Sequence, residues 1–276
     1  MLGTEINTRE IITEWEKDIQ TRIGKLNHIP QLNIIKVGSR EESKLYVNNK
    51  IKKAEKLGIK AHLIELPEDV TQDELNEVLL MMNKPTILQL PLPEHLSAEK
   101  ALEKLSPEID VDGLTVYQKG LLAEGRSEAF VPATAAGVIK LIESVKEIKG
   151  KKVAIISRSE LIGKPLANCI LQKDGYPVIL HSKVSIHRLK TEMRTADIIV
   201  SGCGRRAIFG AENVTFGQVI IDCSMASKEG IKGVGDFDKE DILLHTKNVI
   251  ASGFGHTGPA TVMGLMDNVI KYYELY

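Results

Sequence analysis

Short apolar runs rich in Val and Ile alternate along the chain with longer stretches in which apolar residues recur at helical spacing. The short runs predict β-strands and the longer stretches predict helices, an alternation typical of a mostly parallel α/β sheet. We expect Ser43 to cap a first helix, Gly58 to end it and Thr71 to open the next. In this half the predicted strands are Leu32–Val37, Ala61–Leu66 and Thr86–Leu90, and the predicted helices are Ser43–Leu57 and Val70–Met82.

The alternation restarts after Lys149-Gly150, which indicates a second domain with the rhythm of a doubly wound nucleotide-binding sheet. The Ala135–Val145 stretch is the predicted connecting helix. The last apolar stretch, Thr261–Tyr273, is too short to fold alone, so we expect it to pack back on the first domain. The predicted strands here are Lys152–Ile156, Pro177–Leu180, Asp197–Val200, Val219–Asp222 and Asn248–Ala251, and the predicted helices are Gly163–Gln172 and Ser185–Ala196.

Composition narrows the class of protein. The 276 residues are 43% hydrophobic and 26% charged with a formal net charge of −1, so no basic field invites nucleic acid or an anionic membrane. No apolar run reaches membrane-spanning length, and residues 1–9 are too polar for a signal peptide. Cys169, Cys203 and Cys223 lack metal-site spacing and lie in or beside apolar runs, which favours buried, reduced thiols and a cytoplasmic location.

Candidate chemistry in the first half centres on three motifs. Tyr46 and Lys50 are separated by one helical turn and share a face, although by spacing alone Lys50 is more simply a solvated lysine. Gln89 ends a predicted strand before Pro91 and Pro93, at the sheet edge where open α/β sheets bind ligands, or is only a satisfied strand-end amide. Asp110 and Asp112 form an acidic turn, which is a plain turn or a polar clamp; oxygen ligands for a metal are lacking nearby.

Two loops in the second half suit a nucleotide. The segment SRSELIGKP (157–165) follows a strand and opens a helix, a placement that suits phosphate binding or simple capping. His181 and Ser182 follow the next strand without an acidic residue, which favours NADP over NAD when Arg158 is available. The glycine-punctuated loop SGFGHTGPAT (252–261) permits close backbone approach to a ligand, or only forms the crossing back to the first domain.

Taken in order, these segments resemble the bifunctional methylenetetrahydrofolate dehydrogenase/cyclohydrolase family. The resemblance covers nearly the whole chain and rests on VGSREESKLYVNNK, QLPLP, SPEIDVDG, SRSELIGKP, GPAT and LMDN. It implies an α/β protein of two domains, whose C-terminal helix returns to the first domain. These are a folate-binding catalytic domain at residues 1–134 plus 259–276, and a Rossmann-like doubly wound NADP-binding domain at residues 135–258.

The resemblance also implies the activity and its residues. NADP oxidises methylenetetrahydrofolate to methenyltetrahydrofolate, and the methenyl compound is then hydrolysed to 10-formyltetrahydrofolate in one-carbon metabolism. The resemblance also implies a homodimer built through the nucleotide domains and no metal. Lys50 is catalytic and supported by Gln89, Tyr46 lies against the folate ring, and Asp112 holds the pterin's amino edge. The implied cofactor-binding residues are Ser157, Arg158, Ser159, Gly163, Ser182 and Met225. The implied substrate-binding residues are Tyr46, Leu88, Gln89, Asp112, Gly255, Gly258, Pro259 and Thr261.

The chain also departs from the family's pattern. Ser157 replaces the glycine that opens the nucleotide loop, and Ile109 replaces the lysine before the acidic turn. Other departures are Pro132-Ala133-Thr134-Ala135 for Pro-Cys-Thr-Pro, Asp222-Cys223-Ser224-Met225 for Asp-Val-Gly-Ile, and residues 254–261 for Pro-Gly-Gly-Val-Gly-Pro-Met-Thr. The folate-side set is complete, whereas the cofactor side has drifted. Alternatives are therefore a protein that keeps one of the two activities, a non-catalytic folate- or nucleotide-binding relative, or a shikimate-type dehydrogenase, against which QLPLP argues.

Overall fold

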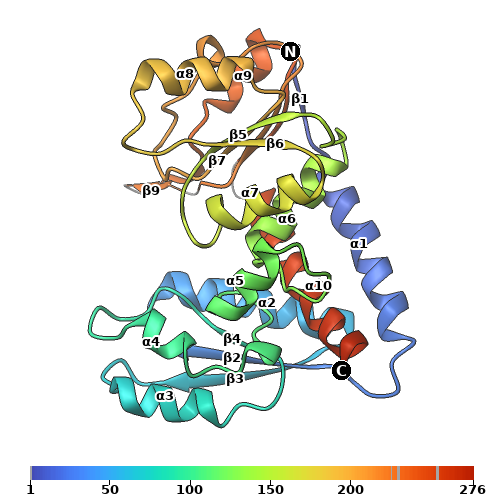
Figure 1. The fold of residues 1–276 in the computed structure, drawn as a ribbon, viewed down its shortest axis with the longest axis vertical. Coiled ribbons are helices and arrows are strands. Elements are labelled where there is room, and N and C mark those ends of the chain that lie inside the picture. Colours follow the sequence, from blue (N-terminus) through green and yellow to red (C-terminus); the bar gives the residue numbers. More distant parts are fainter. Residues whose placement is uncertain (1, 225, 229–230, 253–254) are drawn as a thin grey trace. The chain divides into compact units, whose positions relative to one another are not determined.

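The computed structural model describes residues 2–224, 226–228, 231–252 and 255–276. The chain divides into two compact units (Figure 1). We name them by their sheets: the three-stranded unit comprises Glu14–Ala133 and Val262–Tyr276, and the six-stranded unit comprises Met1–Thr13 and Thr134–Thr261. Within the described ranges, no helix is both long and apolar enough to cross a membrane.

The three-stranded unit is built on a parallel sheet in the order β3-β2-β4. The chain leaves the central strand β2 to pair β3 on one side and later β4 on the other, so the winding reverses between β2 and β4. The strands are β2 (Gln31–Val37), β3 (Lys60–Leu66) and β4 (Thr86–Leu88). The helical elements are α1 (Thr8–Ile23), α2 (Glu41–Leu57), α3 (Gln72–Leu80), α4 (Ala98–Leu102), the 3-10 helix η1 (Pro107–Ile109), α5 (Val116–Ala123) and α10 (Thr257–Leu275), of which α1 and α10 continue from the other unit.

Helices cover both faces of this sheet, with α3 on one side and α2 on the other (Figure 1). Ile35 of β2, Leu75 of α3 and Leu88 of β4 belong to one buried apolar cluster. Because both faces are covered, β2 has buried apolar residues on each of them, Leu32 and Ile34 on one and Ile35 and Val37 on the other. Local signals set the helix ends: Gly58 ends α2 in the left-handed conformation, and Thr71 caps α3.

The six-stranded unit contains a parallel sheet whose described strands run in the order β1-β11-β8-β7-β5-β6. Its strands are β1 (Thr4–Glu5), β5 (Lys152–Ile156), β6 (Tyr176–Ile179), β7 (Ile198–Ser201), β8 (Val219–Asp222) and β11 (Val249–Ala251), and β9 (Ala226–Lys228) pairs antiparallel with β10 (Ile231–Val234). The helical elements are α6 (Ala133–Glu143), α7 (Gly163–Gln172), α8 (Ile186–Thr195), the 3-10 helix η2 (Ala211–Asn213) and α9 (Lys239–His245).

This sheet is doubly wound. From β5 the chain moves to β6 on one side and then to β7 on the other, so the winding reverses between β5 and β7. Helices α8 and α9 lie over one face and α7 over the other (Figure 1). Open sheets of this kind bind ligands at the carboxyl ends of the strands that flank the reversal.

Most of the predicted architecture is confirmed. The chain has two α/β domains, and the C-terminal part of α10 belongs to the three-stranded unit. Two predicted strands and one helix match β5, β8 and α7 at both ends.

Other predictions about the elements are wrong. Ser43 is not the cap of α2, because the helix begins at Glu41 after Arg40 and Ser43 is buried in its first turn. The last helix begins at Thr257 instead of Thr261. Residues 1–13, which the sequence assigned to the first domain, group with the six-stranded unit because β1 pairs with β11.

Candidate functional site

Lys50 and Gln89 meet at the carboxyl edge of the three-stranded sheet. The Lys50 Nζ atom donates a hydrogen bond of 3.0 Å to Gln89 Oε1. The Gln89 amide nitrogen donates to the carbonyl of Leu90 at 2.6 Å, so the amide is held with its oxygen toward the lysine. Lys50 and Gln89, which the sequence analysis identified in two separate motifs, are therefore in direct contact.

Gln89 is positioned by strand β4, which it directly follows. The backbone N–H of Gln89 donates to the carbonyl of Ile35 at 2.8 Å, which continues the β2–β4 pairing one residue beyond the strand. Gln89 thus lies at the carboxyl ends of the two strands between which the winding reverses, where ligands bind in such sheets. The neighbouring Leu88 is only 2% exposed and packs in the apolar core.

Burial lowers the pKa of the Lys50 amine below its ordinary value, because desolvation disfavours the charged form. The negative charge of Asp112 acts in the opposite direction and raises this pKa, but burial is the larger cause. The residue as a whole is partly exposed. This environment makes the neutral amine, a proton acceptor, available at lower pH than for a surface lysine.

Asp112 lies in a turn between η1 and α5. Gly113, the next residue, has a φ of +68°, and a Cβ there would lie 2.2 Å from the carbonyl oxygen of Phe130, so only glycine fits. Asp110 is buried and accepts a hydrogen bond of 2.7 Å from the N–H of Thr115. Burial raises the pKa of Asp110 to about 6. Asp110 therefore shapes the turn, and Asp112 supplies the charge that acts on Lys50.

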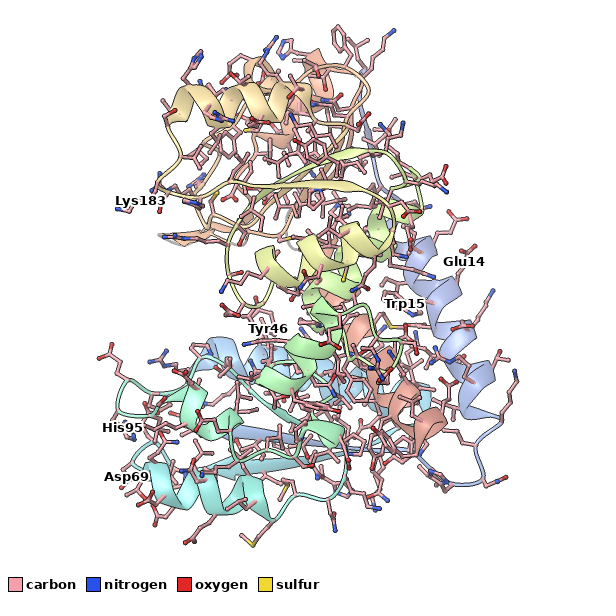
Figure 2. The ribbon with its side chains drawn as sticks, in the orientation of Figure 1. Glu14, Trp15, Tyr46, Asp69, His95 and Lys183 are labelled. Atoms are coloured by element: carbon pink, nitrogen blue, oxygen red, sulfur yellow. The ribbon has the colours of Figure 1, made fainter. Side chains whose placement is uncertain are left out.

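Tyr46 lies on α2 one turn before Lys50, is half-buried and is marked in Figure 2. Helical spacing places both side chains on one face of α2. The three-stranded unit thus brings together the predicted catalytic residues Lys50 and Gln89, with Asp112 acting on Lys50 through its charge. Among the residues that the structure describes, no group of three His, Cys, Asp or Glu side chains is arranged to hold a metal ion.

In the six-stranded unit, the loop from β5 to α7 folds tightly on itself. The Ser159 N–H donates to Ser157 Oγ at 3.3 Å, and the Ile162 N–H donates to Ser159 Oγ at 3.1 Å. A Cβ on Gly163 would lie 2.2 Å from the carbonyl oxygen of Ser157, so this position needs glycine. The loop ends at the N-terminus of α7, a position that favours bound phosphate.

Ser157 itself is not strained. Among the described non-glycine residues, only Asp174 and Ala207 have positive φ, so Ser157 has an ordinary backbone conformation. The serine that replaces the usual glycine takes part in the loop's own hydrogen bonds, because its hydroxyl also donates to Ser159 Oγ at 3.2 Å. The loop is built around the serine.

The remaining predicted cofactor residues lie at the same sheet edge. Arg158 follows β5 and Ser182 follows β6, and both are exposed. The Lys183 N–H donates to His181 Nδ1 at 3.2 Å, which turns the chain after β6; Figure 2 marks Lys183. The loop 180–184 contains no acidic residue. The predicted cofactor residue Met225 lies outside the described residues.

Sequence reasoning missed a buried carboxylate at the carboxyl end of β7. Asp236 is fully buried and accepts hydrogen bonds from the Ser201 hydroxyl at 2.5 Å, the Cys203 N–H at 2.8 Å and the Arg205 N–H at 2.6 Å. Asp222, at the end of β8, is also buried, and burial raises its pKa to about 6. The only signal for Asp236 in the sequence is its place between Gly235 and Phe237.

The glycine-punctuated segment is partly helical. Gly258, Pro259 and Thr261 lie at the start of α10, and Gly255 precedes it. A Cβ at Gly255 or Gly258 would meet open space. His256 ties this segment to the N-terminal part of the same unit, through Thr8 Oγ1 at 2.8 Å and Glu5 Oε2 at 3.2 Å.

Comparisons with known proteins cover almost the entire chain. The family model described as the catalytic domain of tetrahydrofolate dehydrogenase/cyclohydrolase matches residues 4–112, and the model of the NAD(P)-binding domain of the same family matches residues 132–276. The chain is 34% identical over 279 residues to a protein of Listeria innocua called bifunctional protein FolD, covering 98% of this chain and 97% of that protein.

Solved structures give the same result. The crystal structure of the bifunctional enzyme FolD, a methylenetetrahydrofolate dehydrogenase/cyclohydrolase from Campylobacter jejuni, superposes with a TM-score of 0.92 at 28% identity, covering 99% of both chains. A methylenetetrahydrofolate dehydrogenase-cyclohydrolase from Trypanosoma brucei, solved with NADP and an inhibitor, superposes with a TM-score of 0.90 at 28% identity, covering 99% of this chain and 98% of that one.

Proposed function

We propose that this chain, which belongs to the tetrahydrofolate dehydrogenase/cyclohydrolase family, oxidises 5,10-methylenetetrahydrofolate to 5,10-methenyltetrahydrofolate with NADP and hydrolyses the product to 10-formyltetrahydrofolate. The observation that carries the proposal is the contact between Lys50 and Gln89 at the carboxyl edge of the three-stranded sheet. It gives the family's activity a proton-transfer group with a lowered pKa.

Hydrolysis of the methenyl group moves three protons. Water adds to the methenyl carbon and loses a proton, which gives a neutral carbinolamine. One carbon–nitrogen bond then breaks as its nitrogen gains a proton, and the hydroxyl loses its proton to the solvent as the formyl C=O forms, so that one proton is released overall. A neutral Lys50 amine accepts the first proton, and the resulting ammonium donates the second. Gln89 accepts a hydrogen bond from Lys50 Nζ and so keeps the amine in one place, while Asp112 limits how far burial lowers its pKa.

Oxidation of the methylene group needs positioning more than acid–base chemistry, because the methylene carbon loses a hydride directly. NADP, when bound, supplies the hydride acceptor. The residues present fit it: Gly163 allows the β5–α7 loop to fold close against the backbone of Ser157, and the loop ends at a helix N-terminus. We assign the pyrophosphate to this loop and the 2′-phosphate to Arg158 and Ser182, since no carboxylate follows β6 to repel a phosphate.

Two assays test the proposal. The wild-type protein is incubated with methylenetetrahydrofolate and NADP, reduced cofactor is followed by absorbance, and 10-formyltetrahydrofolate is identified by mass spectrometry. Methenyltetrahydrofolate is then supplied without NADP, and its hydrolysis is compared with the spontaneous rate. The proposal predicts activity in both assays. Absence of both activities contradicts it, and activity in only one reduces the protein to a single-step enzyme.

Assembly and location follow from the family resemblance. We propose that the protein is a homodimer formed through its six-stranded units and that it acts in the cytoplasm on folate. Light scattering on the purified protein tests the assembly, and a mass of one chain at micromolar concentration would contradict it.

A further inference from the structure

Asn268 is a buried polar residue of the C-terminal helix α10, with 6% of its surface exposed. Its Nδ2 atom donates one hydrogen bond to the carbonyl of Val111 at 2.8 Å and another to the carbonyl of Val131 at 2.7 Å. An amide NH₂ has two hydrogens, so this group is fully used. Asn268 therefore joins two segments that are distant in sequence, 111–113 and 130–131.

Asp112 is the middle residue of the first of these segments. Val111, on one side of Asp112, is fully buried and is held by Asn268. Gly113, on the other side, lies so close to the 130–131 segment that a Cβ would sit 2.2 Å from the carbonyl of Phe130. Asp112 lies in a turn outside any helix or strand. The turn is closed locally by the Gly113 N–H, which donates to the Asp110 carbonyl at 3.1 Å, and by the bond between Asp110 and Thr115. The hydrogen bonds of Asn268 add a tertiary constraint, because they tie this turn to residue 131.

We propose that Asn268 is a positioning residue for substrate recognition: it holds the Asp112 turn against residues 130–131 and so sets the direction in which the Asp112 carboxylate meets the amino edge of the pterin. This inference rests on the proposed function and on the contact between Asp112 and the amino edge of the pterin that the family resemblance implies. When a carboxylate accepts two parallel hydrogen bonds from a planar group, the strength of these bonds depends strongly on the orientation of the carboxylate. The return of α10 to the three-stranded unit thereby becomes part of folate binding.

The nearest alternative is that Asn268 only stabilises the fold. Two buried carbonyls without donors cost stability in either case, so unfolding measurements alone do not distinguish the two roles. A positioning role predicts an effect that is specific to the folate and acts through Asp112. A purely structural role predicts lower stability with unchanged KM for the folate.

The experiment compares Asn268→Leu with Lys271→Met. Lys271 lies almost one turn later on α10 and donates to the carbonyl of Ala129 at 2.6 Å, so its loss disturbs the neighbouring residue of the same segment without touching Val111. We expect Asn268→Leu to raise the KM for methylenetetrahydrofolate about tenfold, as loss of two hydrogen bonds allows. Its KM for NADP should stay within about twofold of wild type, and Lys271→Met should leave both KM values within about twofold.

A double-mutant cycle then asks whether Asn268 acts through Asp112. In the Asp112→Asn background, Asn268→Leu should cause little further increase in the KM for the folate, because the group that it orients is already altered. Fully additive effects overturn the inference. So does an Asn268→Leu variant that binds folate like wild type, or one whose KM values for folate and NADP rise equally.

Two further comparisons keep the result decisive. If Asn268→Leu does not fold, Asn268→Asp keeps the side-chain size and donates at most one hydrogen bond when protonated, and the same pattern is expected in weaker form; an unchanged folate KM in a folded Asn268→Asp overturns the inference. A wild-type protein that turns over the folate while the Asn268 variants bind it normally overturns only the inference. An inactive wild-type protein overturns the proposed function, and the inference with it.

Discussion

The three-stranded and six-stranded units both place polar residues at the carboxyl ends of parallel strands, but the residues there differ in kind. The three-stranded unit places an amine of lowered pKa against an amide, with a carboxylate acting on it. The six-stranded unit places a tightly folded backbone loop there, closed by Gly163 and by the hydroxyls of Ser157 and Ser159.

The difference explains where the chain departs from its family. A site that works by ionisation needs particular functional groups, and the family resemblance implies that Lys50, Gln89 and Asp112 are such groups. A site that works by backbone shape accepts a new side chain wherever the shape survives. Ser157 is such a case, because its φ is ordinary and its hydroxyl bonds within the loop.

The largest effect is expected when the ionising amine of Lys50 is removed. Lys50→Met keeps the length and apolar character of the side chain but has no amine, so hydrolysis of methenyltetrahydrofolate should fall by roughly 10²–10⁴. Dehydrogenase activity should fall less, because hydride transfer needs no proton transfer. Steady-state rates of both reactions on one preparation measure this. A wild-type rate of hydrolysis in Lys50→Met would contradict the catalytic role of Lys50.

The second prediction concerns the backbone shape of the β5–α7 loop in the six-stranded unit. Gly163→Ala places a Cβ 2.2 Å from the carbonyl of Ser157, and such overpacking costs about 1–3 kcal/mol. The KM for NADP should rise about tenfold or more, while hydrolysis of methenyltetrahydrofolate without NADP should be unaffected. Gly120→Ala is the matched control, since a Cβ there meets no atom within 4 Å. Equal losses of both activities in Gly163→Ala would contradict the assignment of cofactor binding to the six-stranded unit and of hydrolysis to the three-stranded unit.

The third prediction concerns the choice of cofactor. An arginine–phosphate hydrogen bond contributes about 1.5–3 kcal/mol, so Arg158 should give tenfold or better preference for NADP over NAD. Arg158→Ala should remove this preference and leave turnover with NAD largely intact. The kcat/KM values for the two cofactors decide it, with Lys173→Ala at the far end of α7 as control. A wild-type protein that prefers NAD would contradict the assignment.

The smallest expected effect is at Ser157. Because the serine is unstrained, Ser157→Gly should change the affinity for NADP by no more than about twofold, or weaken it slightly as the backbone gains freedom. Titration of both proteins with NADP measures the change. Clearly tighter binding by Ser157→Gly would mean that the serine strains the loop.

Hydrophobic patterning predicted much of the fold because most strands are buried on both faces and read as apolar runs. The β5, β8 and α7 predictions succeeded for this reason, and the glycine and threonine at the ends of α2 and α3 are reliable local signals. Helix α1 was missed although Ile12, Trp15 and Ile19 are buried at helical spacing, because charged residues surround this stripe. Strand β1 has only two residues and forms through its partner β11, which local pattern cannot reveal.

The site was predictable only in part. Spacing alone favoured a solvated Lys50, and no local rule indicates that it meets a residue at the end of β4. The family resemblance selected Lys50, Gln89 and Asp112. It also included Asn268 as the last residue of LMDN, but the role of Asn268, like that of Asp236, depends on tertiary hydrogen bonds that the sequence does not show. Contacts between segments that are distant in the sequence are therefore the part of the site that could not be predicted from local patterns.

The pH dependence of hydrolysis tests most directly whether Lys50 is the tuned proton-transfer group. Values of kcat/KM for methenyltetrahydrofolate, corrected for spontaneous hydrolysis, are measured against pH for the wild type and Asp112→Asn. Because burial lowers the pKa of Lys50, kcat/KM should rise with pH along a limb centred below the ordinary lysine value of 10.5. Asp112 raises that pKa, so Asp112→Asn should move the limb to lower pH. A limb at the ordinary lysine value, or one that moves to higher pH in Asp112→Asn, would contradict the account.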